Sequence, residues 1–163
     1  MELGAASEAD AAAIAAMRNA AAERLTAEFG RGPWSAPTTE AAVRRAFESS
    51  RVLVACAGGS VVGALRLSAR KPWSIDPRLF TSVEQAIYLT EMVIAPAQQR
   101  RGTGRLLVDQ AARIARAWPG DALRLDAWDA PAGAGEFYEK CGFREVGRGR
   151  YRGAKLIYFE RLL

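Results

Sequence analysis

A loop with two glycines, placed between a strand pattern and a helix pattern, is the part of this sequence best suited to bind an anion. Residues 88–94 are rich in β-branched and aromatic types and predict a strand, and residues 106–117 predict a helix. Gly102 and Gly104 stand between them and remove side chains that would keep a ligand from the main chain. The free N–H groups of the first helical turn, the helix dipole and the nearby arginines favour an anion, so the loop predicts a diphosphate site.

Two standard phosphate motifs do not fit this loop. A Walker A loop needs Gly-Lys-Ser/Thr, whereas Gly104 is followed by Arg105 and Leu106. A dinucleotide fingerprint needs a third glycine, and the residue three after Gly104 is Leu107. A glycine loop that only caps an ordinary strand-to-helix turn is the alternative interpretation.

A second segment, residues 136–143, predicts a short helix followed by a strand. Phe137 and Cys141 fall four apart on one helical face, and Gly142 stands where a helix ends in a left-handed cap. Tyr138 is expected to turn to a different face, toward the neighbouring edge of the fold. A half-buried packing role is the alternative for Tyr138, and Cys141 is interpreted as a small core residue.

Together these two segments resemble the GNAT superfamily of N-acetyltransferases. Gln99-x-x-Gly102-x-Gly104 matches the acyl-CoA loop of that family, usually written Gln/Arg-x-x-Gly-x-Gly/Ala, and Tyr138-x-x-x-Gly142-Phe143 looks like its second signature. The predicted elements follow in the order strand, two helices, three strands, helix, strand, helix and two strands. That order is also the order of the family, so the resemblance covers essentially the whole chain.

The resemblance implies the α/β GNAT fold. The expected central sheet is mixed and mostly antiparallel, with six to seven strands, four helices and a V-shaped splay between the fourth and fifth strands. No linker interrupts the 163 residues, so residues 1–163 are expected to form one GNAT N-acetyltransferase domain.

The resemblance also implies acetyl-CoA as co-substrate, held in that splay. Its pantetheine arm would bond to exposed backbone of the strand at 92–94, and its diphosphate to the loop from Gln99 to Arg105. The residues expected to bind it are Met92, Val93, Ile94, Gln99, Arg100, Arg101, Gly102, Thr103, Gly104 and Arg105. Tyr138 would protonate the leaving thiolate after direct attack by the acceptor amine. Many members carry an asparagine seven residues before the tyrosine, where Pro131 stands, so that contact must be missing or made by backbone.

The acceptor amine must lose a proton before it can attack, because ordinary amines are mostly protonated at pH 7. Glu91, just before Met92, is the first candidate base, since a carboxylate there could attract an ammonium and receive its proton. An outward-facing or ion-paired structural carboxylate is the alternative. Asp126 and Asp129, at the end of the next strand, and water are further candidates.

The acceptor itself is left open by the sequence. By the resemblance, residues 30–37 with Trp34 and residues 70–84 with Trp73 and Phe80 would shape the acceptor site. The tryptophans fit an acceptor pocket, a contact in a homodimer, or burial against the sheet. The nearby carboxylates favour a cationic primary amine of a small molecule or a peptide.

Composition excludes several classes of site. The chain has no histidine, so a Ser-His-Asp or Cys-His triad cannot form and zinc loses its commonest ligand. Cys56 and Cys141 lie too far apart for a zinc knuckle and make no disulfide framework, so no metal and a reducing cytoplasm are expected. No apolar run approaches the length of a membrane span, and the N-terminus lacks the basic start of a signal peptide.

The net charge of +5 comes almost wholly from arginine. The arginines are scattered, and those at 144, 148, 150 and 152 are interpreted as the solvated face of a hairpin. A nucleic-acid partner is therefore not expected, although a basic nucleic-acid-binding domain remains one hypothesis. A non-catalytic acyl-CoA-binding sensor is another, and the presence of Tyr138 argues against it.

Overall fold

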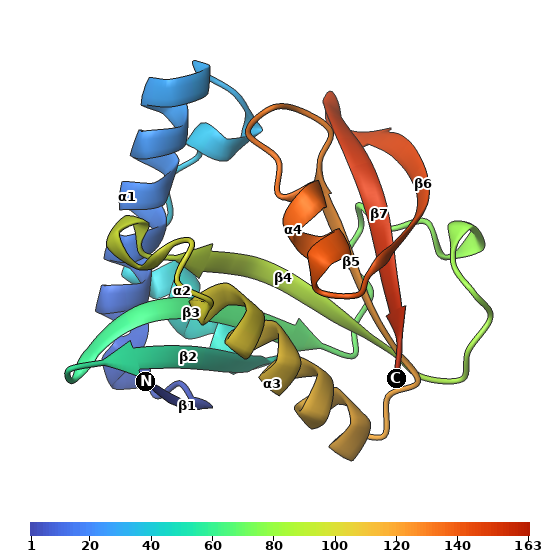
Figure 1. Ribbon diagram of the computed structural model, residues 1–163, viewed down its shortest axis with the longest axis horizontal. Helices are drawn as coiled ribbons and strands as arrows, with labels where there is room; N and C mark the ends of the chain where they lie inside the picture. Colours follow the sequence, from blue (N-terminus) through green and yellow to red (C-terminus); the bar gives the residue numbers. More distant parts are fainter.

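A seven-stranded sheet in the order β1-β2-β3-β4-β5-β7-β6 runs through the computed structural model, which describes residues 1–163 (Figure 1). Every neighbouring pair is antiparallel except β4 and β5, which are parallel. The strands are β1 (Glu2–Ala5), β2 (Arg51–Ala57), β3 (Ser60–Ser68), β4 (Ala86–Ile94), β5 (Ala122–Trp128), β6 (Arg144–Tyr151) and β7 (Ala154–Leu162). The predicted mixed, mostly antiparallel sheet is confirmed.

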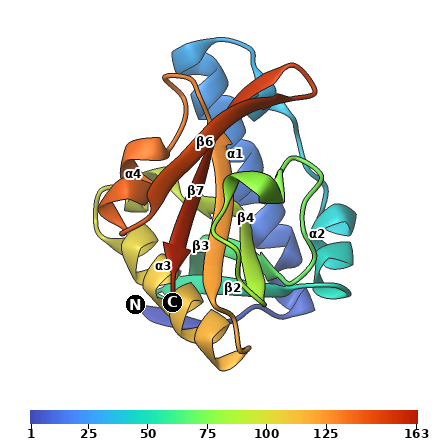
Figure 2. The same cartoon turned by 90° about the vertical axis from the view of Figure 1, so that its right-hand side faces the viewer.

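Four α-helices cover the two faces of this sheet, in the predicted order. They are α1 (Ala11–Phe29), α2 (Glu40–Phe47), α3 (Thr103–Ala117) and α4 (Gly135–Lys140), with short 3-10 turns η1 (Glu8–Asp10), η2 (Pro33–Ser35), η3 (Pro77–Leu79) and η4 (Pro96–Gln98). Figure 2 shows α3 and α4 on one side of the sheet and α1 and α2 on the other. Because strand side chains alternate between faces, two separate apolar layers result, one under each helix pair.

Local capping signals determine where the N-terminal helices begin. The Asp10 carboxylate accepts hydrogen bonds from the Ser7 backbone N–H at 2.7 Å and from its hydroxyl at 2.9 Å, as the capping-box pattern predicts. The Thr39 hydroxyl accepts from the Ala42 N–H, so α2 starts at Glu40. The helix ends at Phe47.

The parallel strands β4 and β5 part soon after they meet. They form only three residue pairs, from Ala86 opposite Ala122 to Tyr88 opposite Arg124, and then continue without pairing to each other. Figure 1 shows the two strands diverging from their common origin near the C-terminus. The remainder of β4 keeps β3 on its other side, where a bulge interrupts the register between Ala64 and Arg66. The predicted splay between the fourth and fifth strands is therefore confirmed.

The connection between β3 and β4, residues 69–85, takes the place of a helix on one face of β5 and β7. Ile75 and Phe80 are buried there against Tyr88, Leu156 and Tyr158. In Figure 2 this green segment lies on the same side of the sheet as α2. Packing against the sheet orders this connection, whose only regular element is the short turn η3.

A buried ion pair fastens this connection to the sheet. The Arg124 Nε lies 3.1 Å from the Glu160 Oε2, and both side chains are almost fully buried. Glu160 also accepts from the Thr81 hydroxyl at 2.6 Å and backbone N–H at 3.3 Å, while Arg124 donates to the Thr81 carbonyl. The two charges are thereby paired with each other, and both also bond to Thr81 near the end of the connection.

The arginines of the C-terminal hairpin are exposed, as the sequence predicts, and two of them also form ion pairs. A bulge between Glu145 and Gly147 breaks the alternation along β6. Arg144 reaches the buried Glu160 at 3.5 Å, whereas Arg148 pairs with Glu145 at 2.7 Å and with Asp129. The predicted solvated arginine face is confirmed, and two of its four arginines also link the hairpin to neighbouring carboxylates.

We expect Glu160→Gln to destabilise the protein by about 3–5 kcal/mol, because it leaves the Arg124 guanidinium buried without its counter-charge. Glu145→Gln is the matched control, since it neutralises an arginine-paired carboxylate on the exposed β6 and should cost much less. Urea unfolding followed by circular dichroism measures both free energies of unfolding. Equal losses in the two variants would contradict the role assigned to the buried pair.

Candidate functional site

The loop before α3 has the backbone of an anion site. Gly102 is the N-cap of α3 with φ +85°, and no side chain caps the helix. Arg100, two residues earlier, also has a positive φ of 60°, which is uncommon outside glycine. The first-turn N–H groups therefore have no intrahelical partner and no competing side-chain acceptor, which leaves them available to a ligand.

Gln99 ties this loop to its neighbours. Its side-chain amide donates to the Ile94 carbonyl at 3.1 Å, and its oxygen accepts from the Arg24 guanidinium of α1 at 3.3 Å. The loop is thus fixed both to the end of β4 and to α1. Arg101 is exposed, and Arg105 donates to the Lys140 carbonyl at the end of α4.

The two loop glycines have different neighbours, which refines the sequence interpretation. A Cβ at Gly102 would meet nothing within 4 Å and would project into open space. A Cβ at Gly104 would lie 3.0 Å from the Phe137 ring and 3.4 Å from the Met92 methyl group. Gly102 thus leaves the main chain open to a ligand, whereas Gly104 lets α3 approach α4 and β4.

Thr103 carries the one buried side-chain polar atom without a hydrogen-bond partner. The residue is 1% exposed, and its hydroxyl has no acceptor or donor in the protein. Leaving a buried hydroxyl unsatisfied costs free energy, which an incoming acceptor oxygen would recover. The open glycine and the uncapped N–H groups together have the geometry of an anion site, while the Thr103 hydroxyl itself is buried.

Tyr138 lies in the main apolar layer beside the β4 edge of the splay. Its hydroxyl donates to the Met92 sulfur at 3.8 Å, and its ring packs edge-on against Phe137 and Phe143. Burial raises the pKa of Tyr138 well above its ordinary value, with smaller contributions from Cys141 and Asp126. The phenol is therefore neutral and holds its proton.

Tyr138 is more deeply buried than the sequence predicts. Its hydroxyl reaches Met92 on the neighbouring strand β4, as expected, but the ring is 7% exposed and packed in the core under α3 and α4. In a helix of six residues the packing of the rest of the chain, rather than helical periodicity, determines which face is buried. Cys141 is a buried free thiol in the same layer, and burial raises its pKa.

Glu91 stands at the β4 bulge in a strained conformation. Its φ is 55°, in the left-handed region that costs a residue other than glycine about 1–3 kcal/mol. Its carboxylate pairs with Arg18 of α1 at 3.1 Å and with Arg66 of β3 at 3.6 Å. These pairs bridge α1, β3 and β4 at the strained residue.

The other two carboxylates named from the sequence differ in their partners. Asp126 accepts a hydrogen bond from the Ser74 hydroxyl at 2.5 Å and has no salt bridge. Burial raises its pKa, and the Ser74 hydrogen bond acts in the opposite direction. Asp129 lies 3.3 Å from the Arg148 guanidinium and is charge-paired.

The aromatic residues of the expected acceptor segments also separate into different environments. Trp34 meets Trp128 edge to face, with ring centroids 5.8 Å apart, and so joins the segment after α1 to the end of β5. Trp73 is 82% exposed, whereas Phe80 is buried and carries the Arg124 guanidinium 4.8 Å above its ring. Burial against the sheet is thus observed for Phe80 and excluded for Trp73.

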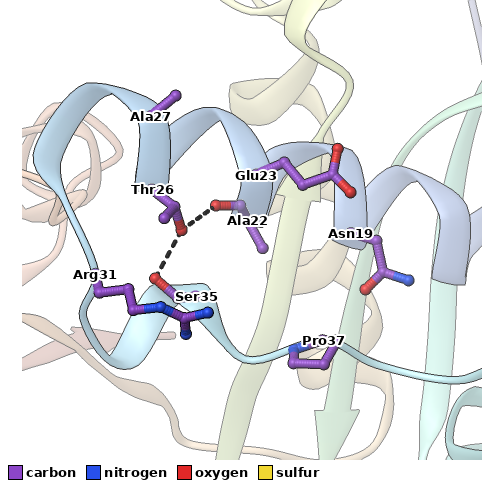
Figure 3. A pocket seen from close by; sticks show the side chains of 8 residues that line it. All are labelled: Asn19, Ala22, Glu23, Thr26, Ala27, Arg31, Ser35 and Pro37. Carbon is purple, nitrogen blue, oxygen red and sulfur yellow. Dashed lines mark hydrogen bonds between the residues drawn. The ribbon is translucent and has the colours of Figure 1, made fainter.

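A separate hollow of about 480 Å³ lies between α1 and the segment that follows it (Figure 3). The Thr26 hydroxyl bonds to the Ser35 hydroxyl at 2.6 Å across its floor. It is lined by Asn19, Ala22, Glu23, Thr26, Ala27, Arg31, Ser35 and Pro37. None of the predicted catalytic or cofactor-binding residues lines it.

Three residues of the site were not found from the sequence. Arg18 and Arg66 hold Glu91, and Ser74 holds Asp126. Arg18 left a weak signal, because it stands four residues after the buried Ile14 and so falls on the apolar face of α1. No group of three or more metal-binding side chains is present, and no helix is long and apolar enough to cross a membrane.

Comparison with known proteins agrees with this geometry. Residues 14–143 match the family model described as acetyltransferase (GNAT) family. No curated protein matches the chain in sequence. Solved structures with the same fold are numerous, and at the low identities given below their likeness shows the fold alone.

Three of these structures cover nearly the whole chain. Ribosomal-protein-alanine N-acetyltransferase from Brucella melitensis is 22% identical with a TM-score of 0.75, and the match covers 100% of both chains. A GCN5-related N-acetyltransferase from Rhodopseudomonas palustris is 23% identical with a TM-score of 0.74, covering 99% of this chain and 95% of the other. The yncA protein from Salmonella typhimurium, solved with its cofactor acetyl-CoA, is 21% identical with a TM-score of 0.72, covering 100% and 94%. Because the family model spans most of the sequence, the chain belongs to the GNAT family of acetyltransferases and is an acyltransferase.

Proposed function

We propose that the protein transfers an acetyl group from acetyl-CoA to a primary amine of a small molecule or peptide. The observation that carries this proposal is the Tyr138 hydroxyl, buried and neutral beside Met92 at the edge of the splay, with the uncapped start of α3 close by. A proton donor and an anion site thus flank the same stretch of β4. Direct attack by the amine in a ternary complex needs no nucleophilic side chain, which suits a chain without histidine.

The donor half of the proposed site uses main-chain groups. The first-turn N–H groups of α3, including that of Thr103, would bind the diphosphate, and the unpaired edge of β4 at Met92–Ile94 would bond to the pantetheine arm. When bound, acetyl-CoA supplies the thioester that the amine attacks. The exposed Arg101 adds positive charge near the same loop.

Tyr138 is proposed as the general acid. Its raised pKa keeps the hydroxyl protonated through the physiological range, and its only hydrogen-bond partner is a weakly accepting thioether. The hydroxyl can therefore protonate a developing thiolate without breaking a strong hydrogen bond, while the raised pKa makes it a weaker acid than an ordinary tyrosine. An acid placed in this way contributes a factor of about 10²–10⁴ to turnover.

Glu91 remains the proposed general base. Its carboxylate is occupied by ion pairs with Arg18 and Arg66, so it can receive the acceptor's proton only after one of the two arginines moves away. The name of the Brucella structure includes protein alanine as an acceptor, and a peptide N-terminus therefore belongs among the amines to be tested.

We expect Tyr138→Phe to lower kcat by about a hundredfold in a thiol-release assay across a panel of amines. The change should leave the melting temperature and acetyl-CoA affinity close to those of the parent, because the hydroxyl loses only a contact to sulfur. Tyr151→Phe, in the distant β6–β7 hairpin, is the matched control. Tight CoA binding with no turnover on any amine would instead favour the sensor function.

Gly102→Ala should weaken CoA affinity about tenfold, because the new methyl group enters the open space before α3 and strains a positive φ. Gly153→Ala is a matched control, since that glycine also has a positive φ of 82° and open surroundings but lies in the β6–β7 turn. Both variants should lose similar stability, and only Gly102→Ala should change binding in titration calorimetry. Equal CoA affinities would contradict the proposed diphosphate site.

Glu91→Gln should lower kcat about tenfold or more, because it removes the proton acceptor and leaves two arginines beside the arriving ammonium. The pH dependence of kcat/KM distinguishes a general base from a fixed negative charge. If Glu91→Gln abolishes the fall of kcat/KM at low pH, Glu91 is the base. If that fall is unchanged, Glu91 acts only as a fixed anion. Glu40→Gln, which neutralises an arginine-paired carboxylate on α2, is the control. Kinetics equal to the parent at every pH would remove Glu91 from the mechanism.

A further inference from the structure

Asp126 lies just beyond the point where β4 and β5 part. The last pair of the two strands is Tyr88 with Arg124, and side chains two apart on a strand share a face. Asp126 therefore lies on the face of Arg124, opposite the layer that holds α3 and α4. Tyr138 lies in that other layer, where burial raises its pKa and the charges of Cys141 and Asp126 add to the shift. Asp126 thus occupies the side of the splay from which an acceptor can meet Tyr138.

Asp126 is a half-buried carboxylate that forms no ion pair. The other buried or half-buried carboxylates, apart from the helix-capping Asp10, all have an arginine partner. They are Asp76, Asp109, Asp129 and Glu160. Asp126 has only the neutral Ser74 hydroxyl, although basic residues outnumber acidic ones in the chain. A half-buried carboxylate without a counter-charge is costly, and a bound cation would relieve that cost.

Aromatic rings stand next to this carboxylate. Trp128 shares the β5 face of Asp126, and its ring meets Trp34 from the segment after α1. Tyr158 is opposite Asp126 in the register and donates to the Ser74 carbonyl at 2.8 Å, which holds the Ser74 hydroxyl in place. An unpaired negative charge beside aromatic faces suits an ammonium attached to an apolar group.

We propose that Asp126 binds the ammonium of the acceptor, and that the acceptor is a primary amine on an apolar group with no carboxylate beside the amine. This inference rests on the proposed N-acetyltransferase function. Asp126 attracts the ammonium, while Trp128 and Trp34 contact the apolar group. A carboxylate next to the amine is disfavoured, because it would stand against Asp126 in a poorly solvated place.

Two amines that differ by one carboxylate test the acceptor class in the unmodified protein. We expect kcat/KM for 2-phenylethylamine to exceed that for phenylalanine by about tenfold or more, as like-charge repulsion in a half-buried site requires. Equal or better use of phenylalanine would overturn the inference.

Asp126→Asn tests the residue, because asparagine keeps the shape and a hydrogen bond to Ser74 but loses the charge. We expect the KM for 2-phenylethylamine to rise about tenfold, with CoA affinity unaltered. Asp76→Asn is the matched control. It neutralises an arginine-paired carboxylate in the β3–β4 connection that also holds Ser74, and it keeps the N-cap of η3. Its KM should equal that of the parent.

Ser74→Ala separates ammonium binding from a merely structural tie. It removes the hydrogen bond that Asp126→Asn keeps and leaves the Asp126 charge in place, so its KM should change much less than that of Asp126→Asn. An equal rise in KM for Ser74→Ala would mean that the tie to the connection, and not the charge, controls acceptor binding, and would overturn the inference. If Asp126→Asn turns over amines as fast as the parent does, this inference alone is overturned. If the parent binds CoA but turns over no amine, the proposed function is overturned as well.

Discussion

β4 and β5 separate after three residue pairs, and the remaining interactions of the sheet must support the edges that this leaves unpaired. Two strands that stop pairing leave backbone N–H and C=O groups without partners, which a buried sheet rarely tolerates. The exposed edge persists here because β4 keeps β3 on its other side and β5 keeps β7. The unpaired edge is thereby a supported surface that can accept the extended arm of a ligand.

Charge pairs hold the two halves of the divided sheet in place from the side that α3 and α4 leave uncovered. Arg18 and Arg66 join α1 and β3 to the strained Glu91 at the bulge of β4. Arg124 and Glu160 join β5 and β7 to the connection that covers them. The two ion pairs of Glu91 are partly exposed and stabilise a local conformation. The Arg124–Glu160 pair is buried, so each of its charges depends on the other.

Features set by neighbours in sequence were predictable, and features set by distant contacts were not. The order of the elements and the loop at Gly102 follow from periodicity and local conformation. The burial of Tyr138 in a six-residue helix and the approach of Phe137 to Gly104 depend on how α3 and α4 pack. Glu91 meets Arg18, and Asp126 meets Ser74, across long separations in sequence that no spacing rule connects.

The two carboxylates of the splay illustrate why the residue type alone does not determine a role. The negative charge of Glu91 is paired with two arginines. These ion pairs hold α1, β3 and β4 together around a residue with a strained backbone. Asp126 has a raised pKa and no counter-charge, so its interaction with a cation is not yet satisfied within the protein. An ammonium that enters the splay gains more from the unpaired carboxylate than from the paired one, because the paired one must first give up an arginine. The distribution of arginines, rather than the positions of the acidic residues, therefore directs the acceptor toward β5.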